Sequence, residues 1–504
     1  MRKYYNAVKI VLFFIIIFVL VGVAAKITER KDSRKKYQDF MELADQIDVL
    51  FLGSSHVLNG INPVQLYSEY GITSYNMGKP GGMVTESYWT LMNALDYCTP
   101  KCVVVDLWAL DRNYKYLDIM NGQESEEDIR NSVSLLHTNM DIWPISKTKI
   151  AAVNDLISDP EIRKEFLWNF TLYHGRWSSI TAGDFKPVNG QGYGEYLLGA
   201  EQRQELYLSS RVEQAENTDQ TLSEKSVCEE YLYKILEECR QRDIDVVLTF
   251  LPMAVSYDQD RQAVNRITEI AAENNLPFLN LLPQENQSIV DYYTDMSDDT
   301  HLNANGMYKV TSYIGGKLKE AYGLPDHRED DAYAGWKERA DQWRAAEIDK
   351  LANQSDLYAE LGEIQYLGAS AIIYLRGDSK AIHDSMVRRF IKHLTGSEVI
   401  EEAFLENGPY LLIRDTSGRM SNVPVIYEFS GETQVEGVNT FLGPTTYIGL
   451  KDYAAVYVNE DFENNYLDME EHYYDDVQII ILGQQGEVIS HLCFDSKWQV
   501  REKK

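Results

Sequence analysis

Two short segments, far apart in the chain, carry the residue types of a serine-based acyl-transfer site. Residues 50–60 form an apolar stretch that ends in a glycine turn and presents Ser55. Residues 298–306 place Asp298 three positions before His301, at the expected start of a helix. A serine hydroxyl is a poor nucleophile until a base takes its proton, and a carboxylate usually holds that base in one tautomer. The two segments therefore indicate a Ser-His-Asp hydrolase or acyltransferase.

The rest of this region predicts alternating strands and helices that position these residues. Apolar strands are expected at residues 48–52, 74–77, 102–107, 245–251 and 277–282. Helices are expected at residues 63–70, 85–97, 222–242, 261–274 and 303–322. Short apolar strands separated by helices predict an α/β fold with a doubly wound, five-stranded parallel sheet. Ligands of such sheets bind at the carboxyl ends of the strands, and Ser55 follows the first strand while His301 follows the last.

Three motifs in this order resemble those of the SGNH/GDSL hydrolase superfamily, over residues 45–323. The first is Gly-Ser-Ser-His at residues 53–56, which stands where that family has Gly-Asp-Ser-Leu. The resemblance makes Ser55 the nucleophile and puts Ser54 in the place of the family's aspartate. It also implies a flavodoxin-like parallel sheet and the activity of an esterase or an O-acyltransferase.

The second matching motif implies an oxyanion hole. Residues 76–81 match the family's Asn-x-Gly-x-x-Gly loop after the second strand. By that match an N–H of Gly81, or alternatively of Gly78, joins the N–H of Ser55 in binding the oxyanion.

The third matching motif is the Asp-x-x-His that ends the family pattern. The resemblance makes His301 the general base and Asp298 the carboxylate that orients it. Asp295 and Asp299 lie close in sequence and are the alternative carboxylates for that role.

One block of the family pattern is absent from the sequence. Many members have Gly-x-Asn-Asp after the third strand, with the Asn as an oxyanion donor, whereas residues 108–111 read Trp-Ala-Leu-Asp. Loss of one such donor typically lowers the rate by ~10²–10³. His56, beside the predicted nucleophile, is the candidate replacement, and we expect His56 and Asn76 to contact the substrate.

Residues 113–221 interrupt the alternation of strands and helices. An insertion at the carboxyl end of a strand is well placed to cover an active site, and the alternative is a subdomain with a purely structural role. Within it, His174, Arg176 and Trp177 are predicted to bind a sugar or an acyl carboxyl group. The alternative for these residues is an Arg–carboxylate pair and a buried Trp that anchor the insertion.

The N-terminus carries an apolar run at residues 10–25, extended by Ala7 and Val8. A helix of this length nearly crosses a ~30 Å hydrocarbon core, so we predict a membrane anchor at residues 1–26 and a charged helical stalk at 27–46. A cleaved signal peptide is the alternative. Basic residues on the C-terminal side favour a cytoplasmic main domain by the positive-inside rule. The short basic N-terminal tail and the family resemblance favour export, which we adopt.

The C-terminal third differs in composition. Residues 324–358 predict a charged helical linker, and residues 359–497 a β-rich accessory domain with one helix around 379–395. Its strands are expected at residues 370–375, 410–413, 423–429, 453–458 and 477–482. Residues 453–495 faintly resemble the interleukin-like inducer modules of sugar-related proteins, which implies glycan binding. A spacer or an oligomerisation domain is the alternative.

The composition of the chain bears on which partners and cofactors it binds. The chain has 78 acidic and 48 basic residues, a formal charge of −30, which disfavours nucleic acid. The five cysteines lack zinc-ligand or redox spacing, and there is no Walker, Rossmann or HExxH motif, so we expect no metal and no cofactor.

Together these features predict a single-pass membrane protein with an extracellular SGNH-type domain that acts on O-acyl groups of a cell-surface or exported polysaccharide. Within the superfamily, the anchored architecture resembles the D-alanyl-transfer and alginate O-acetylation proteins. That resemblance implies an acetyl or D-alanyl group and a membrane-bound O-acyltransferase as a partner. The alternative is a catalytically inactive surface protein that binds a glycan or serves as a scaffold.

Overall fold

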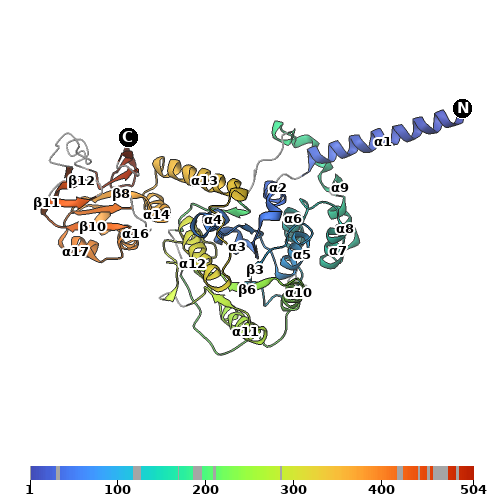
Figure 1. Cartoon of the computed structure of the whole chain (residues 1–504), viewed down its shortest axis with the longest axis horizontal. Helices are drawn as coiled ribbons and strands as arrows, with labels where there is room; N and C mark the ends of the chain where they lie inside the picture. The colour runs from blue at the N-terminus through green and yellow to red at the C-terminus, as the bar shows by residue number, and fades with distance from the viewer. Residues whose placement is uncertain are drawn as a thin grey trace. The chain divides into compact units, whose positions relative to one another are not determined.

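The chain is described from a computed structural model. The described residues are 2–29, 34–116, 126–168, 170–185, 196–207, 212–283, 287–416, 424–440, 443–450, 454–457, 475–483 and 487–503. They form two compact units, each described here by itself (Figure 1). Unit 1 consists of Met1–Arg203, Glu213–Ser288 and Val310–Ala334, and unit 2 consists of Gln204–Val212, Ile289–Lys309 and Gly335–Lys504.

Unit 1 is built on a five-stranded parallel sheet in the order β2-β1-β3-β6-β7. The strands are β1 (Val49–Leu52), β2 (Ser74–Asn76), β3 (Cys102–Asp106), β6 (Asp245–Phe250) and β7 (Phe278–Asn280). β1, β2 and β3 are buried along their whole length, as expected for a sheet covered on both faces. The predicted doubly wound sheet is confirmed, and its order is the flavodoxin-like one, with the switch point between β1 and β3.

Helices cover both faces of this sheet (Figure 1). They are α3 (Ser55–Gly60), α4 (Pro63–Tyr70), α5 (Val84–Ala94), α10 (Val227–Gln241), α11 (Asp258–Asn274) and α12 (Ala304–Tyr322), the last of which begins in unit 2. α5 packs against α10, and Leu66 and Tyr70 of α4 lie against Gly315 of α12. α10 begins five residues later than predicted because the side chain of Ser226 caps its N-terminus.

The insertion between β3 and β6 is mostly helical. It contains α6 (Glu126–Met140), α7 (Lys147–Leu156), α8 (Pro160–Leu167), α9 (Phe170–Tyr173), the 3₁₀ helices η2 (His174–Ser179) and η3 (Ala182–Phe185), and a hairpin of β4 (Tyr196–Leu197) and β5 (Ala200–Glu201). The helices share a small core of their own, in which Trp143 and Phe166 are buried among aliphatic side chains. This core makes the insertion a packed subdomain.

The N-terminal segment contains two helices, α1 (Arg2–Thr28) and α2 (Arg34–Leu43). The stretch Val8–Thr28 of α1 is long and apolar enough to cross a membrane. α2 differs from the predicted stalk, because it packs against β2 in the core of unit 1. Phe40 is fully buried with its ring edge-on to Tyr75 at 5.5 Å, and the Tyr75 hydroxyl donates to the carbonyl of Lys36. The apolar residues of a short charged helix thus find a place in the core.

Unit 2 contains a six-stranded sheet in the order β10-β9-β8-β14-β15-β16 and a three-stranded sheet in the order β11-β12-β13, all antiparallel. The strands are β8 (Ser370–Leu375), β9 (Tyr410–Asp415), β10 (Val425–Ser430), β11 (Thr433–Thr440), β12 (Gly443–Leu450), β13 (Ala454–Tyr457), β14 (Val477–Leu482), β15 (Val488–Phe494) and β16 (Val500–Lys503). The predicted β-rich region is confirmed.

α13 (Ala334–Ala352) lies in the segment 324–358 for which the sequence predicts a charged helical linker. The rest of this unit has more helix than the sequence predicts, with α14 (Leu357–Leu367), α15 (Lys380–His383), α16 (Ser385–Thr395) and α17 (Val399–Glu406). The single helix predicted around 379–395 is two, because the Asp384 side chain caps a new helix by accepting from the N–H groups of Met386 and Val387. α14 and α16 pack on one face of the six-stranded sheet, and β12 and β13 on the other.

Candidate active site

Ser55 is the first residue of α3 and directly follows the carboxyl end of β1. The preceding Ser54 is buried, and its hydroxyl caps the helix by accepting from the N–H of His56 at 3.2 Å. Capping therefore engages Ser54, while Ser55 is partly exposed. Ser54 thus has a structural role in α3, and Ser55 stays the predicted nucleophile.

Gly53 makes the tight turn between β1 and α3 possible. A Cβ atom there would lie 2.6 Å from Cγ2 of Val57 and 2.9 Å from Cβ of Asp106, so a side chain has no room. Because β1 and β3 flank the switch point of the sheet, this turn places Ser55 where ligands of such folds bind.

The loop after β2 is held against α3 by the buried side chain of Asn76. Its amide donates to the carbonyls of Val57 at 2.7 Å and Ile61 at 2.8 Å, and its oxygen accepts from the N–H of Gly78 at 2.8 Å. Asn76 is fully buried and positions the loop, and its predicted contact with the substrate stays a prediction. The N–H of Gly78 is occupied by the same bond.

Gly81 is the better candidate for the second oxyanion donor. Its φ of +62° lies in the left-handed region that favours glycine, and within the described residues its N–H donates to no acceptor. Gly78 instead fits the loop to α3, since a Cβ atom there would lie 2.3 Å from the backbone nitrogen of Leu58. The role of either glycine in an oxyanion hole stays a prediction.

Two lysines lie behind this loop in a pocket lined by α2, α5, α6 and residues 77–80. Nζ of Lys36 donates to the carbonyl of Gly78 at 2.5 Å, and Nζ of Lys79 lies 4.6 Å from the ring centre of Trp143. Burial lowers the pKa of Lys36 well below its ordinary value and that of Lys79 to about 8. Both ammonium groups thus lie in surroundings that disfavour their charged form.

The carboxyl end of β3 supplies a residue that motif comparison did not single out. Asp106 is buried beside the Gly53 turn and accepts from the N–H of Leu251 at 3.0 Å. Burial raises its pKa to about 7, although backbone N–H groups oppose the rise. The only sequence signal was a carboxylate at the end of an apolar strand. The ring of the buried His56 packs edge-on against Trp108, two residues beyond Asp106, at 5.0 Å between ring centres.

The predicted base and its orienting carboxylate are in contact. Nδ1 of His301 lies 2.8 and 2.9 Å from the two carboxylate oxygens of Asp298. The same carboxylate accepts from the backbone N–H groups of Thr300 and His301, at 2.9 and 2.8 Å. Burial alone would raise the pKa of Asp298, but the hydrogen bonds from His301 and from these N–H groups outweigh it and hold the pKa below its ordinary range. Asp298 is therefore an ionised partner of Nδ1, and His301 stays the predicted base.

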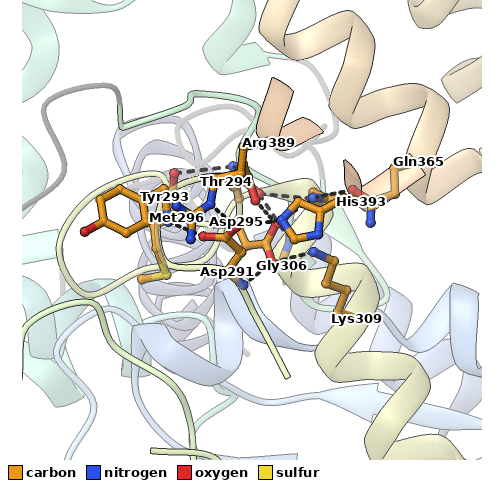
Figure 2. A network of polar contacts seen from close by, with 12 residues as sticks. Asp291, Tyr293, Thr294, Asp295, Met296, Gly306, Lys309, Gln365, Arg389 and His393 are labelled. Atoms are coloured by element: carbon orange, nitrogen blue, oxygen red, sulfur yellow. Dashed lines mark hydrogen bonds and ion pairs between the residues drawn. The ribbon is translucent and has the colours of Figure 1, made fainter. Parts of the chain in front are cut away.

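The two alternative carboxylates have other surroundings. Asp299 is exposed. Asp295 is fully buried and accepts from Nζ of Lys309 at 2.7 Å, Nδ2 of Asn305 at 2.6 Å and the hydroxyl of Thr294 at 2.9 Å (Figure 2). Within the described residues, these contacts leave Asp298 as the carboxylate on His301.

Figure 2 shows how the segment before His301 is held within unit 2. Asp291 accepts from Nε of Arg389 and from Nε2 of His393, the latter at 2.6 Å, both on α16. Its backbone N–H donates to the carboxylate of Asp295 at 2.7 Å. The two carboxylates thus tie residues 291–295 to α16 and to α12, and they position the turn that carries the Asp298–His301 pair.

Ser55 belongs to unit 1, and the Asp298–His301 pair belongs to unit 2. The structure therefore describes the two halves of the predicted triad separately, and their catalytic roles stay predictions.

The predicted sugar or carboxyl clamp lies in the insertion of unit 1. Nη1 of Arg176 donates to the carbonyls of Thr28 and Glu29 at 2.8 Å each, and Nη2 pairs with Asp184 at 2.9 Å. The Arg–carboxylate pair that was the alternative to a substrate role is thus present. Trp177 is 54% exposed, unlike the buried anchor of that alternative. His174 is exposed as well.

Among known proteins, this chain matches only solved structures. No protein-family model and no curated protein sequence matches the chain. Six chains of solved structures match. A candidate acylhydrolase from Bacteroides fragilis is 11% identical, with 58% of this chain and 99% of that chain covered and a TM-score of 0.28. A GDSL-like lipase from Bacteroides thetaiotaomicron is 11% identical, with coverages of 57% and 98% and a TM-score of 0.27.

A third matching structure is a gut microbial diltiazem-metabolizing enzyme, 16% identical, with 56% of this chain and 47% of that chain covered and a TM-score of 0.21. At TM-scores below 0.5 these likenesses say nothing of the substrate or reaction of this chain. The candidate site stands on its own residues.

Proposed function

We propose that the chain is a membrane-anchored, extracellular SGNH-type serine esterase or O-acyltransferase that acts on O-acyl groups of a cell-surface or exported polysaccharide. The observation that carries the proposal is the Asp298–His301 hydrogen bond at 2.8 Å in a chain that also presents Ser55 at the carboxyl end of β1. An ionised carboxylate on Nδ1 of a histidine is what a serine-activating base requires.

The chemistry assigns one role to each group. With Nδ1–H donating to Asp298, the lone pair lies on Nε2 of His301, which accepts the proton of the Ser55 hydroxyl as its oxygen attacks the acyl carbonyl. The tetrahedral oxyanion is stabilised by N–H groups of Ser55 and Gly81. The bond between the acyl carbon and the sugar oxygen then breaks, and Nε2 gives its proton to that oxygen. The sugar leaves with a free hydroxyl, and the acyl group stays on Ser55.

The acceptor decides between hydrolysis and transfer. His301 takes a proton from water in an esterase, or from a second hydroxyl in an acyltransferase, and that oxygen attacks the acyl carbon. The ester bond to Ser55 then breaks, and His301 returns the proton to the serine oxygen. Acetyl and D-alanyl are the acyl groups that the family resemblance implies, with a membrane-bound O-acyltransferase as the donor-side partner. The formal charge of −30 favours a neutral glycan acceptor over a polyanionic one.

Covalent labelling of the full-length chain in lipid nanodiscs tests the proposal. A fluorophosphonate probe should add one adduct, seen by intact-protein mass, to the wild type and to Ser54→Ala, and none to Ser55→Ala. Ser54→Ala is the matched control because it removes a neighbouring hydroxyl that caps α3. Labelling of all three variants, or of none that is folded, would contradict the proposed nucleophile.

An inactive surface protein that binds a glycan or serves as a scaffold is the second candidate. It is favoured by the missing oxyanion Asn, since residues 108–111 offer no amide side chain at that place. This candidate predicts a folded chain that takes no label and leaves the acylation of the polysaccharide unchanged when Ser55 is replaced.

A further inference from the structure

The C-terminal end of α1 is tied to the insertion by one arginine. Both carbonyls that accept from Nη1 of Arg176, those of Thr28 and Glu29, lie at the end of the helix, where carbonyl groups lack intrahelical partners. α9, η2 and η3 all contact α1, and Figure 1 shows α9 beside it. The segment 168–185 is therefore held at the point where the apolar helix ends.

This segment exposes large apolar side chains. The exposed fractions are 54% for Trp168, 38% for Leu172, 54% for Trp177 and 66% for Phe185. Large apolar side chains exposed within one short segment are typical of a contact surface, and Trp is enriched at membrane–water interfaces because one edge of the ring is apolar and the other donates a hydrogen bond. We name these four side chains the 168–185 face.

The charge of the segment differs from that of the chain. Although the whole chain carries −30, residues 168–185 contain one carboxylate, Asp184. Asp184 is buried and paired with Arg176. The 168–185 face thus lacks exposed acidic groups that anionic lipid headgroups would repel.

The length of α1 sets the depth of this face. Val8–Thr28 has 21 residues, so at 1.5 Å per residue it rises about 31 Å, close to the thickness of a bilayer's hydrocarbon core. If Val8–Thr28 spans the membrane, Thr28 lies at the level of the headgroups. Arg176 then holds the 168–185 face at that level.

We infer that the 168–185 face inserts into the lipid–water interface and forms a second membrane contact beside α1. The partner is the lipid bilayer itself, and the inference rests on the membrane anchor in the proposed function. A single helix leaves a domain free to rotate and tilt above the membrane. A second contact at the exit of the helix fixes one orientation of unit 1 on the bilayer.

Spin-label accessibility on the full-length chain in nanodiscs of phosphatidylcholine and phosphatidylglycerol tests this inference. Separate variants Trp177→Cys and Phe185→Cys carry the label at the face, and Val23→Cys carries it within α1. Tyr257→Cys is the matched control, because Tyr257 is an aromatic residue of unit 1 with 65% exposure, at the start of α11. The five native cysteines are buried, and label taken up by the wild type is subtracted as background.

The expected result is that labels at 177 and 185 collide more with oxygen and less with a water-soluble nickel complex than the label at 257, in the same direction as the label at 23. A lipid-like signal at 23 with a water-like signal at 177 and 185 would overturn the inference, leave the anchor standing and assign the face to a protein partner. A water-like signal at 23 would overturn the anchor and the inference together.

Discussion

Nδ1 of His301 lies 2.8 Å from a carboxylate oxygen of Asp298, three residues earlier in the same turn. The carboxylate also accepts from the N–H groups of Thr300 and His301, so the turn itself fixes its orientation. The spacing Asp-x-x-His thus lets one carboxylate accept from the N–H groups of the turn and hold the imidazole.

Replacing Asp298 by Asn should slow the reaction of Ser55 with a fluorophosphonate by about 10³–10⁴-fold. The amide of Asn donates to Nδ1, which moves the imidazole proton to Nε2 and removes the base. Because the pKa of Asp298 lies below its ordinary range, its own titration should leave the rate unaffected above pH 5. The second-order labelling rate is the measurement, and Asp299→Asn, at an exposed neighbour, is the control. Equal labelling rates in Asp298→Asn and Asp299→Asn would show that Asp298 is not the carboxylate that orients His301.

Replacing Asn76 by Ala should loosen the loop that carries Gly81. The change leaves the carbonyl of Ile61 and the N–H of Gly78 without their partner, at about 1–3 kcal/mol for each unsatisfied group. The carbonyl of Val57 loses one of its two donors and keeps the N–H of Ile61. We expect faster hydrogen exchange in peptides that cover residues 49–82, and a lower unfolding temperature. Asn353→Ala, at an exposed site directly after the end of α13, should change neither. Unchanged exchange in the Asn76 variant would show that the loop is held by other contacts.

Much of unit 1 could be predicted because its signals are local. Four buried apolar residues in β1 and the helix patterns between strands need no knowledge of distant partners. α14 was missed because most of its residues are buried on all sides, so it lacks the 3.6-residue alternation of a surface helix. The bonds of Arg176 and Lys36 could not be predicted, since their partners are backbone carbonyls at least 42 residues away, which any residue type supplies.

Asp106 should make stability depend on pH in the direction opposite to an ion-paired carboxylate. Its pKa rises by burial from about 3.8 to about 7, so between these values the folded chain binds more protons than the unfolded chain. The free energy of unfolding should therefore fall as pH rises from 4 to 7, by roughly 4 kcal/mol at most. Asp106→Asn should remove this fall and stabilise the chain at pH 8 relative to the wild type.

Denaturant unfolding at pH 5 and pH 8 measures this effect. Asp219→Asn, at an exposed site in unit 1, should shift stability by less than about 0.5 kcal/mol at either pH. If the free energies of unfolding of Asp106→Asn and the wild type differed by the same amount at pH 5 and pH 8, Asp106 would be ionised in the folded chain over this whole range.

Asp291 should show the opposite pH dependence. Burial would raise its pKa, but hydrogen bonds from His393 and Arg389 outweigh burial and lower it (Figure 2). The unfolded chain then takes up the proton first, so the stability contributed by Asp291 is present above about pH 4 and is lost as pH falls below that value. Asp291→Asn should destabilise unit 2 by about 1–3 kcal/mol at pH 7 and by less at pH 3.

Hydrogen exchange of peptides from α16 and from residues 289–309 gives the local measurement, since the bonds of Asp291 join these two segments of unit 2. Asp349→Asn, on the exposed side of α13, is the control and should leave both peptides unchanged. Because residues 289–309 lead into the turn of Asp298 and His301, Asp291→Asn should also lower the labelling rate of Ser55. Adding Arg389→Lys to Asp291→Asn should restore neither the protection of the α16 peptides nor this labelling rate. Loss of α16 protection with an unchanged labelling rate would separate the stability of this junction from the positioning of the base.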